Sequence, residues 1–260
     1  MELKDKIVVV TGAASGIGRA LAIRFANEGA TKIVCVDLNA EGVQSTAEVV
    51  GGVAMTADVS RESDVARAIA RTEEDVGPID LFCSNAGIGA GEGIDSPNEE
   101  WQRSWDVNVM AHVYASRHLV PRMAERGGGS FLITASAAGL LNQIGGAAYG
   151  VTKHAAVGFG EWLAISHGHQ GIRVSLLCPR AVRTPMTQTD PDATSTAAAA
   201  GDGMMEPETV ADCVVEGLRE DQFLILPHAE VLEYMRRKTT DYGRWIEGMQ
   251  RLFRRLTGMG

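Results

Sequence analysis

The sequence has little of several features that mark whole classes of protein. Basic residues are outnumbered, with 24 Lys and Arg against 33 Asp and Glu, and the formal net charge is −9. Because binding to a phosphate backbone depends on clustered Lys and Arg, nucleic acid is not expected as the main partner. No apolar run approaches the ~20 residues that span a bilayer, and the first residues do not resemble a secretory signal. We therefore expect a cytoplasmic protein without a transmembrane segment.

Cysteine is also scarce, and no Cys-x-x-Cys spacing occurs. Each cysteine lies within an apolar run that is typical of a strand or a helix. We therefore expect reduced core residues and no metal site. The four cysteines are Cys35, Cys83, Cys178 and Cys213.

Short apolar runs alternate with longer amphipathic ones along most of the chain. This alternation is typical of parallel strands that are buried on both faces and joined by helices. Because no linker or internal repeat interrupts it, we expect a single α/β domain. The predicted fold is a Rossmann-type, doubly wound, seven-stranded parallel sheet with helices on both faces. The predicted strands are Ile7–Thr11, Ile33–Asp37, Val53–Ala57, Leu81–Asn85, Phe131–Thr134, Val174–Cys178 and Phe223–Leu226.

Two helices between these strands can be placed from their patterns, over Arg61–Val76 and Pro97–Ala124. A start signal precedes the second helix. Serine can cap a helix, proline suits its first turn, and a glutamate three residues after the cap can accept a bond from the cap's amide. We therefore expect Ser96 to cap this helix, with Glu99 bonding back to it.

Two segments depart from the alternation. Thr187–Gly203 is rich in Thr, Asp, Ala and Gly and is expected to form a loop, although its four consecutive alanines could form a short helix. Ala229–Leu256, after the last strand, is predicted to form one or two helices. The second of these segments is amphipathic, with its arginines largely off the apolar face. That face carries Trp245, Met249, Leu252 and Leu256, and the arginines are Arg251, Arg254 and Arg255.

A glycine-rich turn follows the first strand and contains Gly12, Gly16 and Gly18. Glycine permits the positive φ angles of a tight turn and lets the backbone approach a pyrophosphate closely. The free amides at the helix start, with the positive end of the helix dipole, can then bind phosphates. Taken alone, such a turn also fits an ordinary tight connection between a strand and a helix.

Asp37 strengthens the case for a dinucleotide site, because it ends the second strand about twenty residues after the glycines. There a carboxylate would accept hydrogen bonds from the adenosine ribose. The same charge would repel the additional phosphate of NADP, so NAD is the expected cofactor. Asp58 and Val59, at the end of the third strand, could flank the adenine, although a carboxylate at a helix entry fits Asp58 equally well.

A second group of residues could transfer a proton. Tyr149 and Lys153 lie one helical turn apart, and Ser136 follows the fifth strand. A phenol titrates near 10, and a lysine at i+4 projects from the same helix face. Its positive charge favours the phenolate, which would tune Tyr149 for general acid–base catalysis. Ser136 could bond the reacting oxygen. A Tyr-x-x-x-Lys pair alone is also common on solvated helix faces.

The combination of motifs resembles the short-chain dehydrogenase/reductase family, in its short single-domain branch, from Leu3 to about Leu226. The shared motifs, in their order along the chain, are Thr11-Gly-x-x-x-Gly-x-Gly18, Asn85-Ala-Gly87, Asn108, Ser136 and Tyr149-x-x-x-Lys153. This resemblance implies that Tyr149 is the acid or base, that Ser136 positions the substrate oxygen, and that Lys153 holds the nicotinamide ribose and lowers the pKa of Tyr149. It also implies that Asn108 keeps a water in a proton relay.

The resemblance implies roles in cofactor binding as well. Residues 85–87 would steady the central sheet beside the cofactor, and Val182 and Thr184 would contact the nicotinamide carboxamide. The predicted catalytic residues are Asn108, Ser136, Tyr149 and Lys153. The predicted cofactor-binding residues are Gly12, Ser15, Gly16, Ile17, Gly18, Asp37, Leu38, Asp58, Val59, Asn85, Ala86, Gly87, Tyr149, Lys153, Pro179, Val182 and Thr184.

The chain departs from the family pattern in two places. Arg180 stands where the family usually has glycine. It could narrow the pocket mouth or pair with an acidic substrate group, but we expect it to point to solvent. The chain also continues beyond the last strand. We expect a dinucleotide-binding catalytic domain over 1–228, with a substrate lid at about 183–206. A C-terminal helical extension over 229–260 could cover the substrate pocket, join an oligomer interface or bind a membrane surface through its arginines. We expect it to pack on the same domain or on a neighbouring subunit.

The resemblance predicts an NAD-dependent oxidoreductase that interconverts a secondary alcohol and its ketone. Substrate contacts are expected from Leu140–Ile144, Gly89–Gly93, Arg180 and Thr187–Met205. Apolar side chains in these segments predict an apolar, adaptable pocket, which favours a lipid-like, steroid-like or terpenoid alcohol over a sugar. These side chains are Leu140, Leu141, Ile144, Met186, Met204 and Met205.

Other functions remain open at this point. A catalytically silent NAD-binding sensor or scaffold is the alternative to an enzyme, although such proteins commonly lose the tyrosine or the lysine. An epimerase or dehydratase would have another glycine spacing, and an enoyl reductase would space the tyrosine and lysine farther apart. Family members usually pair through the helices placed here at Pro97–Ala124 and Tyr149–His167, so a homodimer or homotetramer is expected.

Overall fold

The computed structural model of the chain describes residues 1–91, 93–188, 194–201 and 203–259. Within this part of the chain, seven parallel strands form one sheet in the order β3-β2-β1-β4-β5-β6-β7. The predicted fold class and strands are confirmed, with most strand ends shifted by a few residues. The strands are β1 (Ile7–Thr11), β2 (Lys32–Asp37), β3 (Val53–Thr56), β4 (Leu81–Ser84), β5 (Gly129–Thr134), β6 (Ile172–Leu177) and β7 (Leu224–Ile225).

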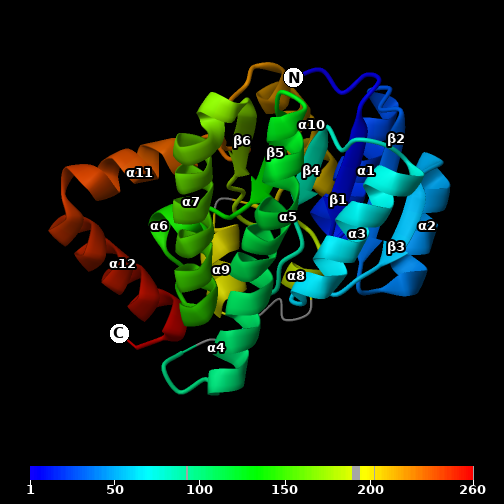
Figure 1. Cartoon of the computed structure of the whole chain (residues 1–260). Helices are drawn as coiled ribbons and strands as arrows, with labels where there is room; N and C mark the ends of the chain where they lie inside the picture. Colours follow the sequence, from blue (N-terminus) through cyan, green and yellow to red (C-terminus); the bar gives the residue numbers. More distant parts are fainter. Residues whose placement is uncertain (92, 189–193, 202, 260) are drawn as a thin grey trace.

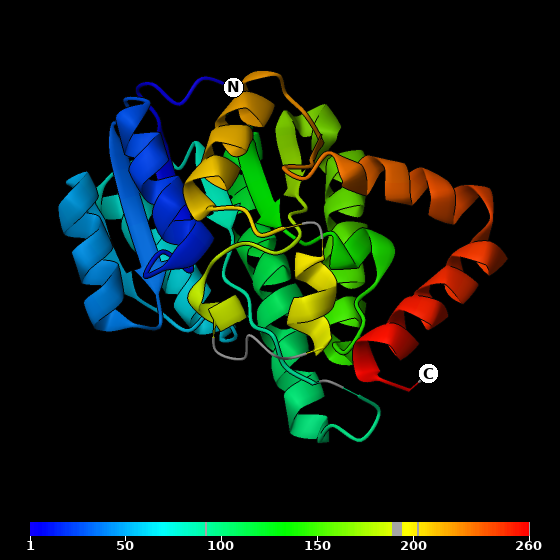
Figure 2. The same ribbon diagram turned by 180° about the vertical axis from the view of Figure 1, so that it is seen from behind.

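Helices cover both faces of the sheet (Figures 1 and 2). Successive strand residues point to opposite faces, so both cores are built from the same strands. Val9 belongs to one buried cluster, while Val8 and Val10 belong to the other. The first cluster lies under α3 (Glu62–Asp75), α5 (Ala111–Glu125) and α7 (Ala147–His167). The second lies under α1 (Gly16–Asn27), α2 (Ala40–Val50) and α10 (Pro207–Arg219).

The strand order reverses between β1 and β4, its neighbour on the other side. In open α/β sheets the crevice outside the carboxyl ends of the strands at this switch point is where ligands bind. The glycine turn leaves β1 there, and residues 85–87 leave β4 beside it.

The helix predicted over Pro97–Ala124 consists of three parts, namely α4 (Asn98–Trp105), a π-helical turn η1 (Asp106–Met110) and α5. The predicted capping role of Ser96 is wrong, because the helix begins one residue later and Pro97 holds the cap position without a side-chain bond. The Pro97 carbonyl accepts the first helical bond from the Glu100 amide at 3.0 Å. The Ser96 hydroxyl instead accepts a bond from the Gly93 amide, which closes the preceding loop.

Two helices follow the last strand and extend past α7 on the outer side of the molecule (Figure 1). They are α11 (Glu230–Thr240) and α12 (Tyr242–Thr257), and the Asp241 side chain caps the second by accepting from the Arg244 amide at 2.9 Å. Val231 is buried against Ala137 and Leu141, with Trp245 beside them. The extension therefore packs on α6 (Ala138–Leu141), the short helix that follows β5.

The segment expected to form a loop contains helices in its described part. These are α8 (Pro185–Gln188) and α9 (Thr194–Ala200), so the alanines do form a short helix. The rest of the predicted segment, at 189–193 and 202, lies outside the described residues. A short 3-10 turn, η2 (Gly168–Gln170), follows α7. No helix in the described ranges is both long and apolar enough to cross a membrane.

Candidate active site at the carboxyl edge of the sheet

The glycine turn after β1 is held in a compact shape that excludes side chains. Gly12 has φ +69°, and a Cβ there would stand 2.9 Å from the Ala86 Cα. A Cβ on Gly18 would stand 2.1 Å from the Gly12 carbonyl oxygen. Both positions therefore require glycine. The turn leads directly into α1, whose first amides have no partner within the helix. Ser15 caps this end without using its hydroxyl and is exposed.

Asp37 joins the end of β2 to the glycine turn. One carboxylate oxygen accepts from the Ala14 amide and the other from the Asn39 amide, each at 2.9 Å. A carboxylate has about four acceptor positions, so further hydrogen bonds to a ribose are possible. Leu38, directly after it, is an apolar side chain left 67 % exposed. The predicted residues Asp37 and Leu38 thus lie at an open edge of the glycine turn.

Asn85 links three neighbouring strands. Its Nδ2 donates to the Thr11 carbonyl at 2.9 Å, and its Oδ1 accepts from the Thr134 hydroxyl at 3.0 Å. The Thr11 hydroxyl in turn accepts from the Asn85 amide at 2.9 Å. These bonds tie the ends of β1, β4 and β5 together. The sheet edge beneath the candidate site is therefore rigid.

Ser136 stands in the turn between β5 and α6 and is buried. Its hydroxyl accepts from the Ala138 amide at 3.1 Å and lies 3.4 Å from the Pro179 carbonyl oxygen, to which it donates. Pro179 follows β6, so its carbonyl brings the neighbouring strand end into the site. The serine is thereby fixed in place by two segments of the chain.

Tyr149 and Lys153 come together with Ser136, although they are separated from it in the sequence. Tyr149 lies near the start of α7, and the Lys153 Nζ is 5.7 Å from the centre of its ring. Burial raises the pKa of Tyr149, and a hydrogen bond with Ser136 partly opposes that rise. In the chain on its own, burial thus has the larger effect on the pKa of Tyr149, and the lowering expected from Lys153 stays a prediction. Removing water from the phenol disfavours its charged form.

Lys153 is buried, with 3 % of its surface exposed. Its Nζ donates to the Thr134 carbonyl oxygen at 2.9 Å. Burial lowers the pKa of this lysine to about 8, since the charged ammonium has lost its water. A Cβ added to Gly87 would stand 3.3 Å from both the Lys153 Nζ and the Asn108 Oδ1. Three of the predicted segments therefore meet at Gly87.

Asn108 lies in the π-helical turn, a form that is frequent at functional sites. Its Oδ1 accepts from the Ile88 amide at 2.9 Å, and its Nδ2 donates to the Ile88 carbonyl at 3.0 Å and to the Thr152 hydroxyl at 3.2 Å. The side chain thus joins the loop after β4 to α7. Its expected role in a water relay stays a prediction.

The remaining predicted residues are spread along the same edge. Thr184 adjoins the glycine turn, because a Cβ on Gly16 would stand 3.0 Å from its Cγ2. Val182 is buried and pairs with Met205 in an isolated bridge. The Asp58 carboxylate accepts from the Ser60 amide at 3.0 Å, which makes a turn after β3. Val59 is part of the core beneath α3.

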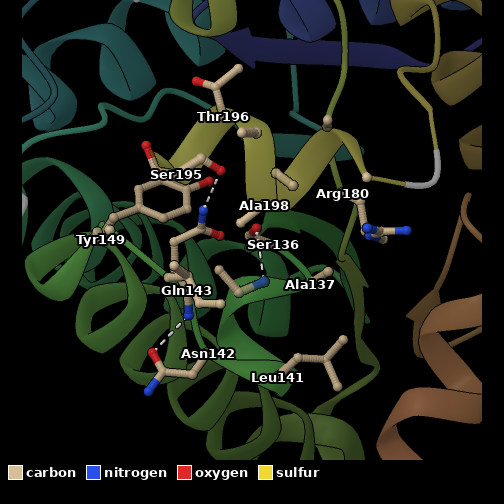
Figure 3. A pocket seen from close by; sticks show the side chains of 18 of the residues that line it. Ser136, Ala137, Leu141, Asn142, Gln143, Tyr149, Arg180, Ser195, Thr196 and Ala198 are labelled. Atoms are coloured by element: carbon tan, nitrogen blue, oxygen red, sulfur yellow. Dashed lines mark hydrogen bonds between the residues drawn. The ribbon is translucent and has the colours of Figure 1, made fainter. Parts of the chain in front are cut away.

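A cavity of about 790 Å³ opens beside Ser136 and Tyr149. Figure 3 shows both side chains at its wall, with Ser195 and Thr196 of α9 opposite and Arg180 farther along. The Gln143 side chain spans to α9 by donating to the Ser195 carbonyl at 2.8 Å. The apolar lining includes Leu141, Ile144, Met186, Trp245, Met249, Leu252 and Leu256.

The predicted lining is correct in part. Leu141, Ile144 and Met186 line the cavity, as do residues 89–91. Leu140 does not, because it packs with the extension in the small core beside α6. Met204 does not line it either, and Met205 packs instead against the core beneath α1 and α10. Residue 92, in the predicted 89–93 segment, lies outside the described residues.

Arg180 does not point to solvent, and that expectation is wrong. Its side chain is 11 % exposed, and its Nη1 donates to the Glu230 carboxylate at 2.9 Å. The guanidinium also lies over the Tyr234 ring at 5.9 Å. Both partners belong to α11, so the departure from the usual glycine is explained by the C-terminal extension, against which the arginine packs.

A cover over the substrate pocket is one of the possibilities that the sequence leaves open for the extension, and α11 and α12 do contribute to the cavity wall. Tyr234 and Arg237 of α11 line it, and Arg255 of α12 lines it from a position that the pattern places off the apolar face. The amphipathic character of α12 is the available signal. It indicates a covered face but cannot say what that face covers.

The parallel doubly wound sheet with a glycine turn after its first strand defines a Rossmann-type fold. The serine, tyrosine and lysine gathered beside that turn add a candidate proton-transfer site to it. The sequence profile of the short chain dehydrogenase family matches residues 6–195. The chain belongs to the short-chain dehydrogenase/reductase family, and its relatives in that family are dehydrogenases and reductases of hydroxyl and keto compounds.

Two sequence relatives and one solved structure show how far the similarity extends. The chain is 36 % identical to 1-deoxy-11-beta-hydroxypentalenate dehydrogenase of Streptomyces exfoliatus, over 95 % of this chain and 91 % of that protein. It is 31 % identical to human epidermal retinol dehydrogenase 2, over 85 % of this chain and 74 % of that protein. A crystal structure of a short chain dehydrogenase/reductase from Burkholderia phymatum in complex with NAD matches with a TM-score of 0.85 and 28 % identity, over 94 % of this chain and 96 % of that one.

Proposed function

We propose that the protein is an NAD-dependent oxidoreductase that interconverts an apolar secondary alcohol and its ketone. The observation that carries this proposal is the convergence of Ser136, Tyr149 and Lys153 beside one cavity, next to the glycine turn. The relatives are named as dehydrogenases of hydroxyl-bearing compounds, which supports the same reaction type.

In the proposed mechanism, Tyr149 carries the proton. In the reducing direction the phenol donates its proton to the developing alkoxide, and in the oxidising direction the phenolate accepts the proton of the alcohol. The raised pKa keeps the phenol protonated at neutral pH, which suits the donor role. Ser136 would donate a hydrogen bond to the same substrate oxygen, for which its single hydroxyl proton must turn away from the Pro179 carbonyl oxygen. Its fixed position lowers the cost of orienting that oxygen.

Lys153 and Asn108 would support this proton transfer without contacting the substrate. The Lys153 ammonium adds positive charge near the phenol, and it would also hold the nicotinamide ribose. Asn108 fixes the loop after β4 against α7. A relay that returns the proton to solvent through a water beside Asn108 remains part of the proposal.

The glycine turn and its surroundings would hold the cofactor. The first amides of α1 would bind the pyrophosphate, and Asp37 would accept from the adenosine ribose. The region around Leu38, Asp58 and Val59 would flank the adenine, while Pro179, Val182 and Thr184 would contact the carboxamide end. When bound, the nicotinamide would supply the hydride chemistry at the carbinol carbon.

Preference for NAD over NADP is proposed from the charge of Asp37. Its carboxylate accepts a hydrogen bond from the Ala14 amide and is thereby held beside the glycine turn. If the adenosine ribose binds there, the negative charge of Asp37 would repel the additional ribose phosphate of NADP. The apolar lining of the cavity, together with its size, supports a lipid-like, steroid-like or terpenoid substrate. The described helices α8 and α9 would form part of a substrate lid over about 183–206.

A panel of secondary alcohols tests the proposal against the sensor alternative. The wild-type protein is incubated with NAD and each alcohol, reduced cofactor is followed by its absorbance, and NAD binding is measured separately by calorimetry. We expect turnover of at least one apolar cyclic alcohol together with NAD binding. Tight NAD binding without turnover across steroid, terpenoid and aliphatic alcohols would favour a sensor.

A further inference from the structure

Within the part of the chain that the structure describes, the charged side chains lining the cavity are all positive. Among the described residues, the lining contains Arg180, Arg237 and Arg255 and no Asp, Glu or Lys. The whole chain has a formal charge of −9, so the positive charge of these lining residues is opposite in sign to the net charge of the chain. A wall of this kind favours a ligand of opposite charge.

Two of the three arginines come from the C-terminal extension, Arg237 from α11 and Arg255 from α12. The guanidinium carbons of Arg180 and Arg237 lie 5.9 Å and 5.8 Å from the centre of the same ring, that of Tyr234. Arg255 comes from α12, one turn after Leu252, which lines the same cavity. The cationic side of the cavity is therefore built mainly by α11 and α12.

The three arginines differ in how far their charge is already balanced. Arg180 is nearly buried and donates to Glu230 at 2.9 Å. Arg237 is bonded to an acidic group, among the residues that the structure describes, only through its Nε, which donates to Glu233. This is an exposed pair one helical turn apart, and such pairs are weak. Arg255 forms no ion pair with any described residue. The terminal nitrogens of Arg237 and the whole Arg255 guanidinium therefore remain the groups best able to bind an anion.

The rest of the cavity has another character. Leu141, Met249 and Leu252 provide apolar surface. Ser136 and Tyr149 provide the proposed reactive end. A ligand that complements the whole cavity therefore has three parts. These are a hydroxyl or carbonyl beside Ser136 and Tyr149, an apolar body, and an anionic group near the arginines.

We propose that the substrate is an apolar hydroxy or keto acid whose carboxylate lies on the α11 and α12 side of the cavity, where the charges of Arg237 and Arg255 attract it. Arginine suits this task because its planar guanidinium can give a carboxylate two parallel hydrogen bonds. The identity of the reacting end rests on the function proposed above. The carboxylate subsite rests only on the cavity and its arginines.

Binding measurements test the subsite without relying on turnover. The probes are lithocholate, which carries one secondary hydroxyl and one carboxylate, and its methyl ester, each titrated calorimetrically into the NAD-loaded protein. Decanoate and methyl decanoate form a second pair, because a steroid could fail for reasons of shape. We expect each acid to bind at least about tenfold more tightly than its ester, and the difference to shrink when salt is raised from about 20 to about 500 mM.

Arginine variants assign the effect to the subsite. In Arg237→Gln and Arg255→Gln we expect acid binding to weaken about fivefold each, and about twentyfold in the double variant, with ester binding unchanged. The matched controls are Arg236→Gln and Arg254→Gln, which change the preceding residue on each helix and do not line the cavity. The controls should bind the acids as the wild type does.

The outcomes separate this proposal from the proposed function. Equal binding of acids and esters, or no binding of either acid, overturns the carboxylate subsite even if apolar alcohols are oxidised. Equal losses in cavity and control variants overturn it too, since they would indicate a general effect of charge. Tight acid binding that depends on Arg237 and Arg255, without oxidation of any alcohol, would retain the subsite and contradict the oxidoreductase.

Discussion

Asp37 accepts hydrogen bonds from two backbone amides, and this double role shapes what its substitution does. Replacing it by alanine would remove both bonds and loosen the glycine turn. Asp37→Asn removes the charge and keeps one of the two acceptor oxygens, so it retains one of these bonds and loses the other. It therefore changes the charge with less disturbance of the turn than alanine would.

We expect Asp37→Asn to lower the preference for NAD over NADP by about tenfold or more, because a charge repelling the second phosphate is worth on the order of 1 kcal/mol or more at this range. The measurement is the ratio of kcat/KM for the two cofactors at one substrate concentration. Asp75→Asn, at the exposed end of α3, serves as control. An unchanged ratio in Asp37→Asn would assign the preference to other residues.

His112 is a buried histidine that the proposed mechanism does not use. Its Nδ1 shares a hydrogen bond of 2.6 Å with the Ser84 hydroxyl, and its Nε2 has no partner among the described residues. Burial lowers its pKa to about 3, with a further contribution from the charge of Lys153. The folded protein therefore keeps this ring neutral at pH values where an unfolded histidine is charged.

Stability should consequently fall in mild acid. An unfolded histidine binds its proton below about pH 6.5, whereas folded His112 does so only near pH 3. Between these values the unfolded state holds more protons, so the free energy of unfolding decreases as pH decreases. This one residue should account for a loss of about 2 to 3 kcal/mol between about pH 6.5 and about pH 4.5.

The check is urea unfolding of wild type and His112→Gln across that range. Glutamine can keep the hydrogen bond to Ser84 but does not titrate. Its stability should therefore depend less steeply on pH than that of the wild type. Parallel curves for the two proteins would show that His112 does not set the acid limit.

At the scale of single elements, the contact between α6 and α7 fixes where Ser136 and Tyr149 meet. A Cβ on Gly139 of α6 would stand 2.4 Å from the Lys153 carbonyl oxygen, which belongs to the α7 backbone. The two helices can approach this closely only if residue 139 has no side chain. A Cβ added to Gly248, in the middle of α12, would meet, among the described residues, only the Arg251 guanidinium, at an ordinary contact distance of 3.7 Å.

We predict opposite effects for two glycine-to-alanine changes. Gly139→Ala should destabilise the fold by roughly 2 kcal/mol or more, since two backbones must move apart, and should reduce activity with it. Gly248→Ala should leave activity unchanged and stabilise the protein by about 0.5 to 1 kcal/mol, because glycine is a poor helix former. Thermal unfolding and initial rates provide the comparison. Equal effects of the two changes would contradict the close approach.

The sheet is predictable because its strands depend on local patterns, whereas the residues of the proton-transfer site are predictable only because several motifs, in their order and spacing, resemble those of a known family. Strands such as Val8–Val10 are apolar on both faces, and the turn at Gly12 follows from the strand that precedes it. The π turn at Asn108 and the start of α4 after Pro97 are not predictable, because small differences in backbone hydrogen bonding decide them. The burial of Arg180 could not be predicted either, since its partner Glu230 is 50 residues away.

On the scale of the whole molecule, apolar side chains remain exposed on two of the long helices. Ile165 is 82 % exposed and Trp162 is 54 % exposed on α7, and Trp105 is 40 % exposed at the end of α4. Large exposed apolar surface is costly in a soluble monomer. It supports the proposal that the chain forms a homodimer or homotetramer through these helices.

Ile165→Glu should weaken that association. A charge at the centre of an apolar contact loses its water without gaining a partner, so sedimentation at micromolar concentration should show smaller species than the wild type. Ile94→Glu, another exposed isoleucine outside these helices, is the control. A wild type that sediments as a monomer would refute the proposed association.

The account as a whole depends on Tyr149 as the group that moves the proton, and its replacement is the most direct measurement. Turnover of an active alcohol and NAD affinity are measured for wild type, Tyr149→Phe and the surface control Tyr242→Phe. We predict that Tyr149→Phe lowers kcat by at least about a hundredfold while NAD affinity changes little and Tyr242→Phe behaves as wild type. A near-normal kcat in Tyr149→Phe would contradict the account.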